Sequence, residues 1–349
     1  MLTFVLLLLQ LSGTVGQLCT NTCNWASDGA CDDGGPRAQY AACSLGTDCV
    51  DCGSQVSTSA GLLSALANIA VSHHRELQTS VSTVADLTSA LANTAVGRIV
   101  LASGTYYLSA ELSITRSVVL EAAAGATVTL NAQASSSSPR RVLYIAPGSS
   151  GVVQLIGLSI TGGYVDLECN SGCNPACCGG GGVLIDGGAV TLSSCTITGN
   201  TCQGGEGGGV YVRSGTVTLS SCTITGNTAT FVYARGQGGS GGGVSIQTSS
   251  VTSLVTLSSC TITGNSVAHY GGGVLIAGIG KVTLSSCIIT GNSAYSATNT
   301  GNNPTNNGGG GVAVFTTGGT VAILSSNISG NIVAGQNSVR AHAQTFPWP

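Results

Sequence analysis

Charged and aromatic side chains are scarce in this sequence. Asp, Glu, Lys and Arg together make up 7% of the 349 residues, and aromatic residues make up 4%. So little charge is unusual for a helix-rich domain and suits a surface of Thr, Ser and Asn. The net charge of −3 and the lack of any basic run exclude an electrostatic nucleic-acid surface. No Asp or Glu follows Glu206, so the C-terminal part of the chain supplies no catalytic carboxylate.

Long apolar runs are also missing beyond the N-terminus. The run at residues 1–11 is too short to span a membrane as a helix, and small residues follow it. This pattern predicts a signal peptide over residues 1–16. Fifteen cysteines fit an oxidising compartment. We therefore expect a secreted or cell-surface protein without a membrane span in the mature chain.

Glycine, in contrast, is abundant, with 53 residues, and much of it belongs to a repeated phrase. The sequence Thr-Leu-Ser-Ser-Cys-Thr-Ile-Thr-Gly-Asn occurs at 191–200, 218–227 and 256–265, and with one change at 283–292. A run of glycines followed by a short apolar strand stands ahead of most copies. Repetition of this kind indicates units that stack on one another to bury a shared core.

Each copy alternates with a period of two residues, which is typical of strands. Val190, Leu192, Cys195 and Ile197 face one way, and the threonines between them face the other way. Each unit thus predicts three short strands: a Gly-led strand, a Val-Thr-Leu strand and a Cys-Thr-Ile-Thr strand. The longer intervals between copies lie after Gly-Asn, so insertions gather at one corner. We predict an all-β protein, a right-handed parallel β-helix with three walls, over residues 84–335.

The region ahead of this solenoid divides into a small module at 17–53 and a Ser/Ala-rich linker at 54–83, and a tail at 336–349 follows the solenoid. Leu87 begins a weakly helical stretch that we expect to cap the open end of the first coil. The module is too short for a core, so disulfides must hold it together. The predicted disulfide cysteines are Cys19, Cys23, Cys31, Cys43, Cys49 and Cys52, whose pairing stays open.

The Asp-Gly and Asp-Cys segments of this module resemble those of Lin-12/Notch-type repeats. That resemblance implies a calcium site, which needs six or more oxygen ligands. The alternative is a plain disulfide module with solvated turn aspartates. No other cofactor is required. The possible calcium ligands are Asp28, Asp32, Asp33, Asp48 and Asp51.

The stretch from Leu101, Leu-Ala-Ser-Gly-Thr-Tyr, followed by Val-Thr-Leu and the repeats ending Thr-Gly-Asn, resembles the pectin-lyase-like right-handed β-helix superfamily. The repeats look most like those of polymorphic outer-membrane proteins. The resemblance implies the fold, but this fold hosts lyases, hydrolases, epimerases and non-enzymes.

Two groups of cysteines belong to the solenoid. Five at one corner are expected to form disulfides rather than a metal site, since no histidine lies near them: Cys169, Cys173, Cys177, Cys178 and Cys202. Four stack inside the coil, and we favour buried free thiols over disulfides between rungs: Cys195, Cys222, Cys260 and Cys287.

Two asparagine features follow from the same stacking. Asn327 is expected to continue the column of stacked cysteines, facing inward, which would make it a poor glycan acceptor despite its sequon. A separate column of asparagines is expected to form an amide ladder: Asn200, Asn227, Asn265, Asn292 and Asn331.

Candidate catalytic groups are few and unpaired. They are Asp166, Glu168, Asp186 and Glu206, with Arg213 as a possible cation. A binding role has more support, because unusual side chains gather at the corner that carries the insertions. The expected ligand-binding residues are Tyr164, Phe231, Tyr233, Arg235, His269, Tyr270 and Tyr295.

We therefore expect a non-catalytic scaffold that presents loops on one edge to a glycan or a cell-surface protein. The first alternative is a lyase, hydrolase or epimerase that acts on acidic polysaccharide. A minor alternative is an ice-binding surface, because the outward threonines of successive copies form a Thr-x-Thr array.

Overall fold

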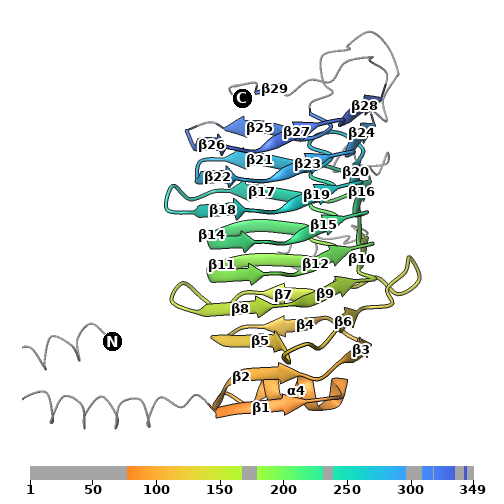
Figure 1. Ribbon diagram of the computed structural model, residues 1–349, viewed down its shortest axis with the longest axis vertical. Coiled ribbons are helices and arrows are strands. Elements are labelled where there is room, and N and C mark those ends of the chain that lie inside the picture. Colours follow the sequence, from red (N-terminus) through yellow and green to blue (C-terminus); the bar gives the residue numbers. More distant parts are fainter. Residues whose placement is uncertain are drawn as a thin grey trace, which may run out of the picture. The chain divides into compact units, whose positions relative to one another are not determined.

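The computed structural model describes residues 77–166, 179–230, 239–295, 309–316, 318–334 and 342–343. They belong to one compact unit, Glu76–Pro349. Its strands pair in parallel, coil upon coil, in three sheets that form three walls (Figure 1). The predicted parallel β-helix is confirmed. The predicted signal peptide, six-cysteine module and calcium ligands lie outside the described residues.

The first wall is a 15-stranded sheet to which most coils contribute twice. In β11 and β14 the Gly-led strand and the Val-Thr-Leu strand run on as one element of 11 residues. The strands of the first wall are β1 (Leu77–Val81), β2 (Val96–Leu101), β4 (Leu112–Ile114), β5 (Val118–Ala122), β7 (Leu143–Ile145), β8 (Val152–Ile156), β11 (Val183–Ser193), β14 (Val210–Ser220), β17 (Val244–Thr248), β18 (Leu254–Ser258), β21 (Val274–Gly278), β22 (Lys281–Ser285), β25 (Val312–Thr316), β26 (Thr320–Leu324) and β29 (His342–Ala343).

The second wall holds the Thr-Ile-Thr strands, and the third wall holds the residues that follow Gly-Asn. The second wall consists of β3 (Gly104–Tyr107), β6 (Val128–Asn131), β9 (Leu158–Thr161), β12 (Thr196–Thr198), β15 (Thr223–Thr225), β19 (Thr261–Thr263), β23 (Ile288–Thr290) and β27 (Asn327–Ser329). The third wall consists of β10 (Tyr164–Asp166), β13 (Thr201–Gln203), β16 (Thr228–Thr230), β20 (Ser266–Val267), β24 (Ser293–Tyr295) and β28 (Ile332–Ala334).

The make-up of the walls differs from the prediction. The Gly-led and Val-Thr-Leu strands, expected to form separate walls, share one sheet. The actual third wall was missed because its strands are only two or three residues long, too short for alternation to be seen. Its inward residues are small, and three of them form their own cluster apart from the main core: Ala229, Val267 and Ala294.

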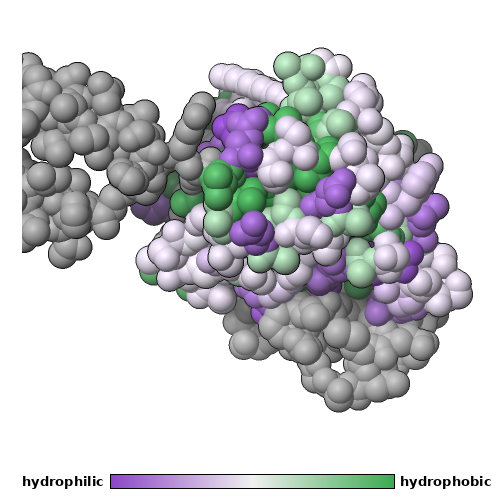
Figure 2. Space-filling model, turned by 90° about the horizontal axis from the view of Figure 1, so that it is seen from below, coloured by the Kyte–Doolittle hydropathy of each residue, from purple (hydrophilic) through white to green (hydrophobic). Residues whose placement is uncertain are grey.

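The helix α4 (Val84–Ala92) closes the N-terminal end of the solenoid, as expected. Leu87 and Ala90 are buried and join the main core. The helix begins with Thr83, whose side chain accepts a hydrogen bond from the backbone N–H of Asp86. Figure 2 looks onto this end, where hydrophobic and hydrophilic residues are mixed on the surface. The strand β1 precedes the helix and pairs with β2, so the solenoid begins within the range predicted as linker. At the other end, β29 pairs with β25 inside the predicted tail.

The four stacked cysteines occupy one inward column and none forms a disulfide. Each is 1% exposed, and each thiol donates to the leucine carbonyl of the preceding coil, as from Cys222 to Leu192 at 3.4 Å. The favoured alternative, buried free thiols, is confirmed. Parallel side chains in register point the same way, which leaves neighbouring sulfurs side by side rather than facing one another.

The column does not continue at Asn327, and that prediction was wrong. Asn327 pairs with Ile288, whereas Ile289 pairs with Ile328. Because neighbouring strand residues point to opposite faces, Asn327 lies outward and is exposed. Ser326 takes the place after Cys287, and its Oγ accepts a hydrogen bond from the Cys287 backbone N–H at 3.1 Å.

The asparagine ladder is confirmed. The Nδ2 of Asn227 donates to Oδ1 of Asn265 at 3.0 Å and to the backbone carbonyl of Ile197 at 2.9 Å. The same Oδ1 of Asn265 also accepts the backbone N–H of Asn227 at 3.0 Å. Four of the five side chains are fully buried, so the ladder satisfies backbone groups that water cannot reach.

The corner between the first and second walls is made by a column of serines in the left-handed backbone region. Ser221 has a φ of 53°, and its equivalents in other coils lie between 47° and 54°. Ser221 is exposed, so its conformation is held by the coil and not by side-chain packing. This turn in the backbone lets both Leu192 and Cys195, three residues apart, face the core.

Replacing Ser221 with valine is expected to destabilise the protein by about 1–3 kcal/mol, because a β-branched side chain clashes with a left-handed backbone. Asparagine at the same position is expected to have little effect, since it tolerates this region. Urea unfolding measures both changes. Thr218→Val, in a regular strand, is the control. Equal stability of Ser221→Val and Ser221→Asn would contradict the explanation.

Candidate functional site

Three insertions leave the solenoid at one edge, after the third wall and before the Gly-led strands. The described chain stops at Asp166, Thr230 and Tyr295 and resumes at Gly179, Gly239 and Gly309. This is the corner expected from the sequence, displaced by the length of a third-wall strand, but a shorter insertion, residues 249–253, lies between β17 and β18 of the first wall. Several predicted site residues lie in these insertions, outside the described residues: Glu168, Cys169, Cys173, Cys177, Cys178, Phe231, Tyr233 and Arg235.

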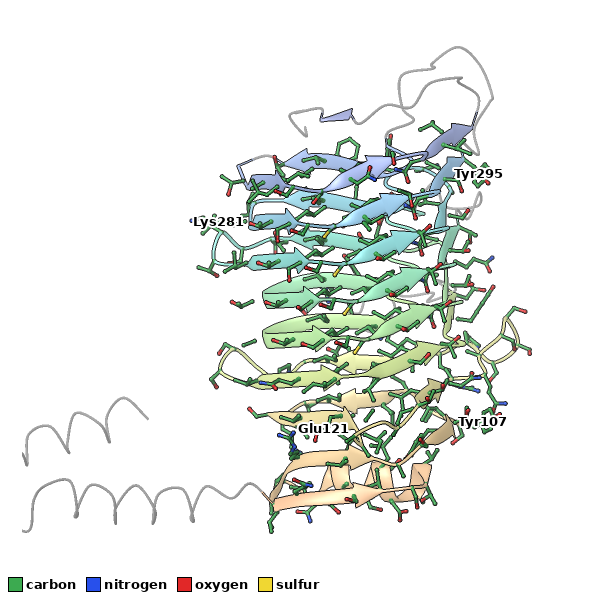
Figure 3. The ribbon with its side chains drawn as sticks, in the orientation of Figure 1. Tyr107, Glu121, Lys281 and Tyr295 are labelled. Atoms are coloured by element: carbon green, nitrogen blue, oxygen red, sulfur yellow. The ribbon has the colours of Figure 1, made fainter. Side chains whose placement is uncertain are left out.

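Tyr164 and Tyr295 stand on the outer face of the third wall. The hydroxyl of Tyr164 contacts Oε1 of Gln203 in the next coil. The pKa of Tyr164 is raised by burial first, and then by the negative charge of Asp166. Tyr295 is 51% exposed on β24 (Figure 3). Four rungs separate β10 from β24, about 19 Å, so the two tyrosines do not form one site.

Cys202 lies in the middle of β13 and is fully buried on the inner side of the third wall. Its position in the register is taken by Val165 in the coil before and by Ala229 in the coil after. Its predicted partners lie outside the described residues, so the disulfide stays a prediction.

Asp186 and Arg213 form an ion pair at the bend of the first wall. Nη1 of Arg213 lies 3.2 Å from Oδ2 of Asp186, and the Ser214 hydroxyl donates to the other carboxylate oxygen at 3.3 Å. Both ionic side chains are about one-third exposed or less. The pair links adjacent coils where β11 and β14 shift register. This arrangement assigns Asp186 a structural role at the bend.

Glu206 lies elsewhere, in a column of residues directly ahead of the glycine runs. Gly179, Glu206, Ser240 and Tyr270 pair with one another in parallel, one from each coil. The glycine that follows each of them folds the chain back onto a Gly-led strand. At Gly207, which has a φ of +67°, an added Cβ would lie 3.0 Å from the Cβ of Tyr211. The column therefore covers the outward face of the Gly-led strands.

The Glu206 carboxyl is held in a poorly solvated position. Burial raises its pKa to about 7, and the side chains of Gln247 and Ser245 oppose this shift. Oε2 of Glu206 and Oγ of Ser245 are both buried, and neither completes a hydrogen bond within the part of the chain described. Near neutral pH, this carboxyl therefore lies between its protonated and ionised forms, as a general acid or base requires.

An aromatic cluster lies farther along the same column. The rings of Tyr270 and Phe315 pack edge to face at 4.9 Å, and His269 contacts Tyr270 at 5.8 Å. Burial lowers the pKa of His269 and raises the pKa of Tyr270. Two rungs separate Tyr270 from Glu206, about 10 Å. Three of the residues predicted from sequence, Glu206, His269 and Tyr270, therefore lie along this column. We call the column, together with the outward residues of the Gly-led strands beneath it, the candidate strip.

Sequence reasoning missed three polar or aromatic members of this strip. Tyr211, Ser245 and Gln247 point outward from the Gly-led strands, where β21 has Leu275 and Ala277. The sequence did carry a signal, because these residues occupy positions that are apolar in other copies of the repeat. The signal was not used because an outward residue of a strand is normally solvated. Here the chain ahead of the glycines covers these residues.

The raised pKa of Glu206 predicts a pH-dependent stability. A carboxyl with a folded pKa of about 7 and an ordinary value of 4.5 favours folding below pH 4.5. That contribution is lost as the pH rises toward 7, by up to about 3 kcal/mol. Urea unfolding at several pH values is expected to show this loss of stability. Glu206→Gln should remove the pH dependence. Glu121→Gln, which breaks the ion pair with Arg98, is the control and should retain the pH dependence.

Among the described residues, no group of three or more His, Cys, Asp or Glu side chains gathers as a metal site would require. In the same part of the chain, no helix is long and apolar enough to cross a membrane.

Among the comparisons with known proteins, the match to a family model supports the fold. No curated protein matches the sequence. Among solved structures, a crystal structure of pectate lyase Pel9A aligns with a TM-score of 0.37 at 12% identity, covering 71% of this chain and 72% of that chain. The family described as the right handed beta helix region matches residues 150–344, which is more than half of the sequence. The chain belongs to the right-handed β-helix family.

Proposed function

We propose that this chain is a secreted or cell-surface scaffold that binds a glycan or a partner protein without catalysis, through the edge where its insertions gather. One observation carries the proposal. Three third-wall strands, β10, β16 and β24, are followed by insertions at that edge, so a rigid stack of coils carries several loops on one side. Secretion is proposed from the N-terminal apolar run and the cysteine content.

The chemistry of the edge suits such ligands. Tyr295 exposes half of its surface beside the insertion that follows β24, and an exposed tyrosine offers both an apolar face and a hydroxyl. His269 and Tyr270 add a second aromatic group in the short connection between β20 and the glycine run ahead of β21. Two of the candidate carboxylates belong to different places in the described coils: Asp186 is paired with Arg213 at the bend, and Glu206 lies in the column ahead of the glycines.

A glycan array with the purified chain, followed by titration of the best ligand, tests the proposal. Tyr295→Ala is expected to weaken binding by about tenfold, the loss typical of an aromatic anchor. Tyr107→Ala is the matched control: Tyr107 is 57% exposed, close to the 51% of Tyr295, but it lies on β3 of the second wall (Figure 3). Equal losses in both variants, or no ligand among glycans and cell-surface proteins, would contradict the proposal.

A second candidate is a polysaccharide lyase, hydrolase or epimerase that acts on acidic polysaccharide. The perturbed carboxyl of Glu206 favours it, since a pKa near 7 suits proton transfer at neutral pH. A uronate-release assay separates the two candidates. Turnover that is lost in Glu206→Gln but kept in Asp186→Ala would support the enzyme and place the proton transfer on Glu206.

A third candidate is ice binding by the second wall. Thr196, Thr223 and Thr261 pair in register, and so do the threonines two residues later, which gives two parallel columns of partly exposed threonines. Ile288 interrupts the first column in the next coil. If this wall binds ice, the protein should show thermal hysteresis and Thr223→Tyr should reduce it. Thermal hysteresis that Thr223→Tyr leaves unchanged would exclude the threonine columns as the ice-binding surface.

A further inference from the structure

Asn327 is placed by the register of the last described rung. β27 pairs with β23 so that Asn327 lies beside Ile288 and Ile328 lies beside Ile289. Ile289 is fully buried and Ile328 packs against the core, so the residues on either side of Ile328 face outward. Asn327 and Ser329 are both exposed. The two polar members of an Asn-Ile-Ser triplet therefore stand together on the outer face of the second wall.

The Asn327 amide is not used by the fold within the described residues. Its backbone N–H donates to the Cys287 carbonyl at 2.8 Å, as the ladder of the sheet requires. Its neighbour in sequence, Asn331, contrasts with it. Asn331 is 7% exposed, and its Nδ2 donates to the Ile289 carbonyl at 2.8 Å. Asn327 thus keeps an accessible amide, whereas the ladder asparagines are locked inside.

The neighbour of Asn327 on the outer face of this wall is apolar. Ile288 pairs with Asn327 and is 47% exposed, where the coils before it carry threonine. β27 is also the end strand of its sheet among the described residues. An end strand beside an exposed apolar side chain invites pairing with a second chain unless something covers it.

We propose that Asn327 is an N-glycosylation site whose glycan covers Ile288 and the open edge of β27. Asn-Ile-Ser is an acceptor triplet with no proline in the middle, and a glycan is bulky and solubilising. Ile288 lies one rung, about 4.8 Å, from Asn327, so a first sugar on Asn327 can reach Ile288. The site rests on the secreted location proposed above.

The modification balances as a group transfer without oxidation or reduction. The Nδ2 of Asn327 forms a bond to the anomeric carbon of the first N-acetylglucosamine and loses a proton. The bond from that carbon to the diphosphate of a lipid-linked oligosaccharide breaks, and the lipid diphosphate leaves.

Expression of the full chain in a eukaryotic secretory host tests the site. Digestion of the secreted protein with peptide N-glycosidase is expected to lower its mass by one glycan and to convert Asn327 to aspartate, as peptide mass spectrometry reports. Ser329→Ala keeps Asn327 but breaks the triplet, so the mass shift should vanish. Ser329→Thr keeps the triplet, so the shift should remain.

A chain that is secreted with Asn327 unmodified would overturn the site and leave the binding function standing. A chain retained in the cytosol would overturn the secreted location and the site together. Size-exclusion chromatography tests separately whether the glycan prevents β27 from pairing with a second chain. The Ser329→Ala protein is expected to self-associate as its concentration rises, whereas the Ser329→Thr protein stays monomeric. Identical elution of the two would remove the covering role.

Discussion

Alanine in place of Gly208 is expected to cost the protein more than about 3 kcal/mol of stability. Gly208 is the second glycine of its run, and an added Cβ would lie 2.4 Å from the carbonyl oxygen of Thr228 and 2.6 Å from that of Gly242. Both obstacles are backbone, one in the third wall and one in the next coil, so no side chain can turn away. The clash can be relieved only by moving two coils apart.

Chemical unfolding monitored by circular dichroism measures this loss. Gly318→Ala is the matched control, because the nearest atom to its added Cβ is the Cγ2 of Ile279 at 3.9 Å, an ordinary contact. Neither glycine has a positive φ, so the two substitutions differ only in the room available for the added Cβ. If Gly208→Ala were as stable as Gly318→Ala, the close approach of the glycine run to the third wall would be wrong.

Aspartate in place of Asn227 is expected to destabilise the protein by about 3–5 kcal/mol at neutral pH. The change keeps the shape of the side chain and removes its amide donors. The Nδ2 of Asn227 donates to Oδ1 of Asn265 and to the carbonyls of Ile197 and Thr225. A carboxylate would face the same three oxygens in a fully buried position, with no donor to offer them.

The loss should depend on pH with a definite sign. Burial among oxygens raises the folded pKa of the new carboxyl above its unfolded value of about 4. The Asn227→Asp protein is therefore least destabilised in acid, where the carboxyl is protonated in both states. It loses stability as the pH rises from the unfolded pKa of the carboxyl through its folded pKa. Asn327→Asp, made in unglycosylated protein, is the control, because that side chain is exposed. Similar effects at the two positions would show that the ladder contributes little.

The repeat was enough to predict the coils, the inward face and the ladder. Those features follow from a period of two and from identical residues stacked at one position, so they need no knowledge of neighbours. The third wall escaped because Thr201–Gln203 has a single inward residue, which leaves no alternation to read. The position of Asn327 was misread because the degenerate copy shares few residues with the others, and an error of one residue reverses the face.

The candidate strip shows a different limit. Glu206, His269 and Tyr270 were named from their sequence positions, but nothing local placed Glu206 against Ser245 and Gln247 of the next coil, or Tyr270 against Phe315. Their burial arises because each glycine run turns the chain back over the strand that follows. The perturbed pKa of Glu206 is a consequence of that contact.

The amino-acid sequence alone was sufficient for the class of fold and the order of its coils, because stacking energies repeat wherever the residues repeat. Only the tertiary structure decided which asparagine is exposed, which carboxyl loses its water and at which edge the described chain leaves the solenoid for its insertions. Each of these depends on contacts between coils about 27–40 residues apart in the chain, and such contacts form only when the coils are stacked in register.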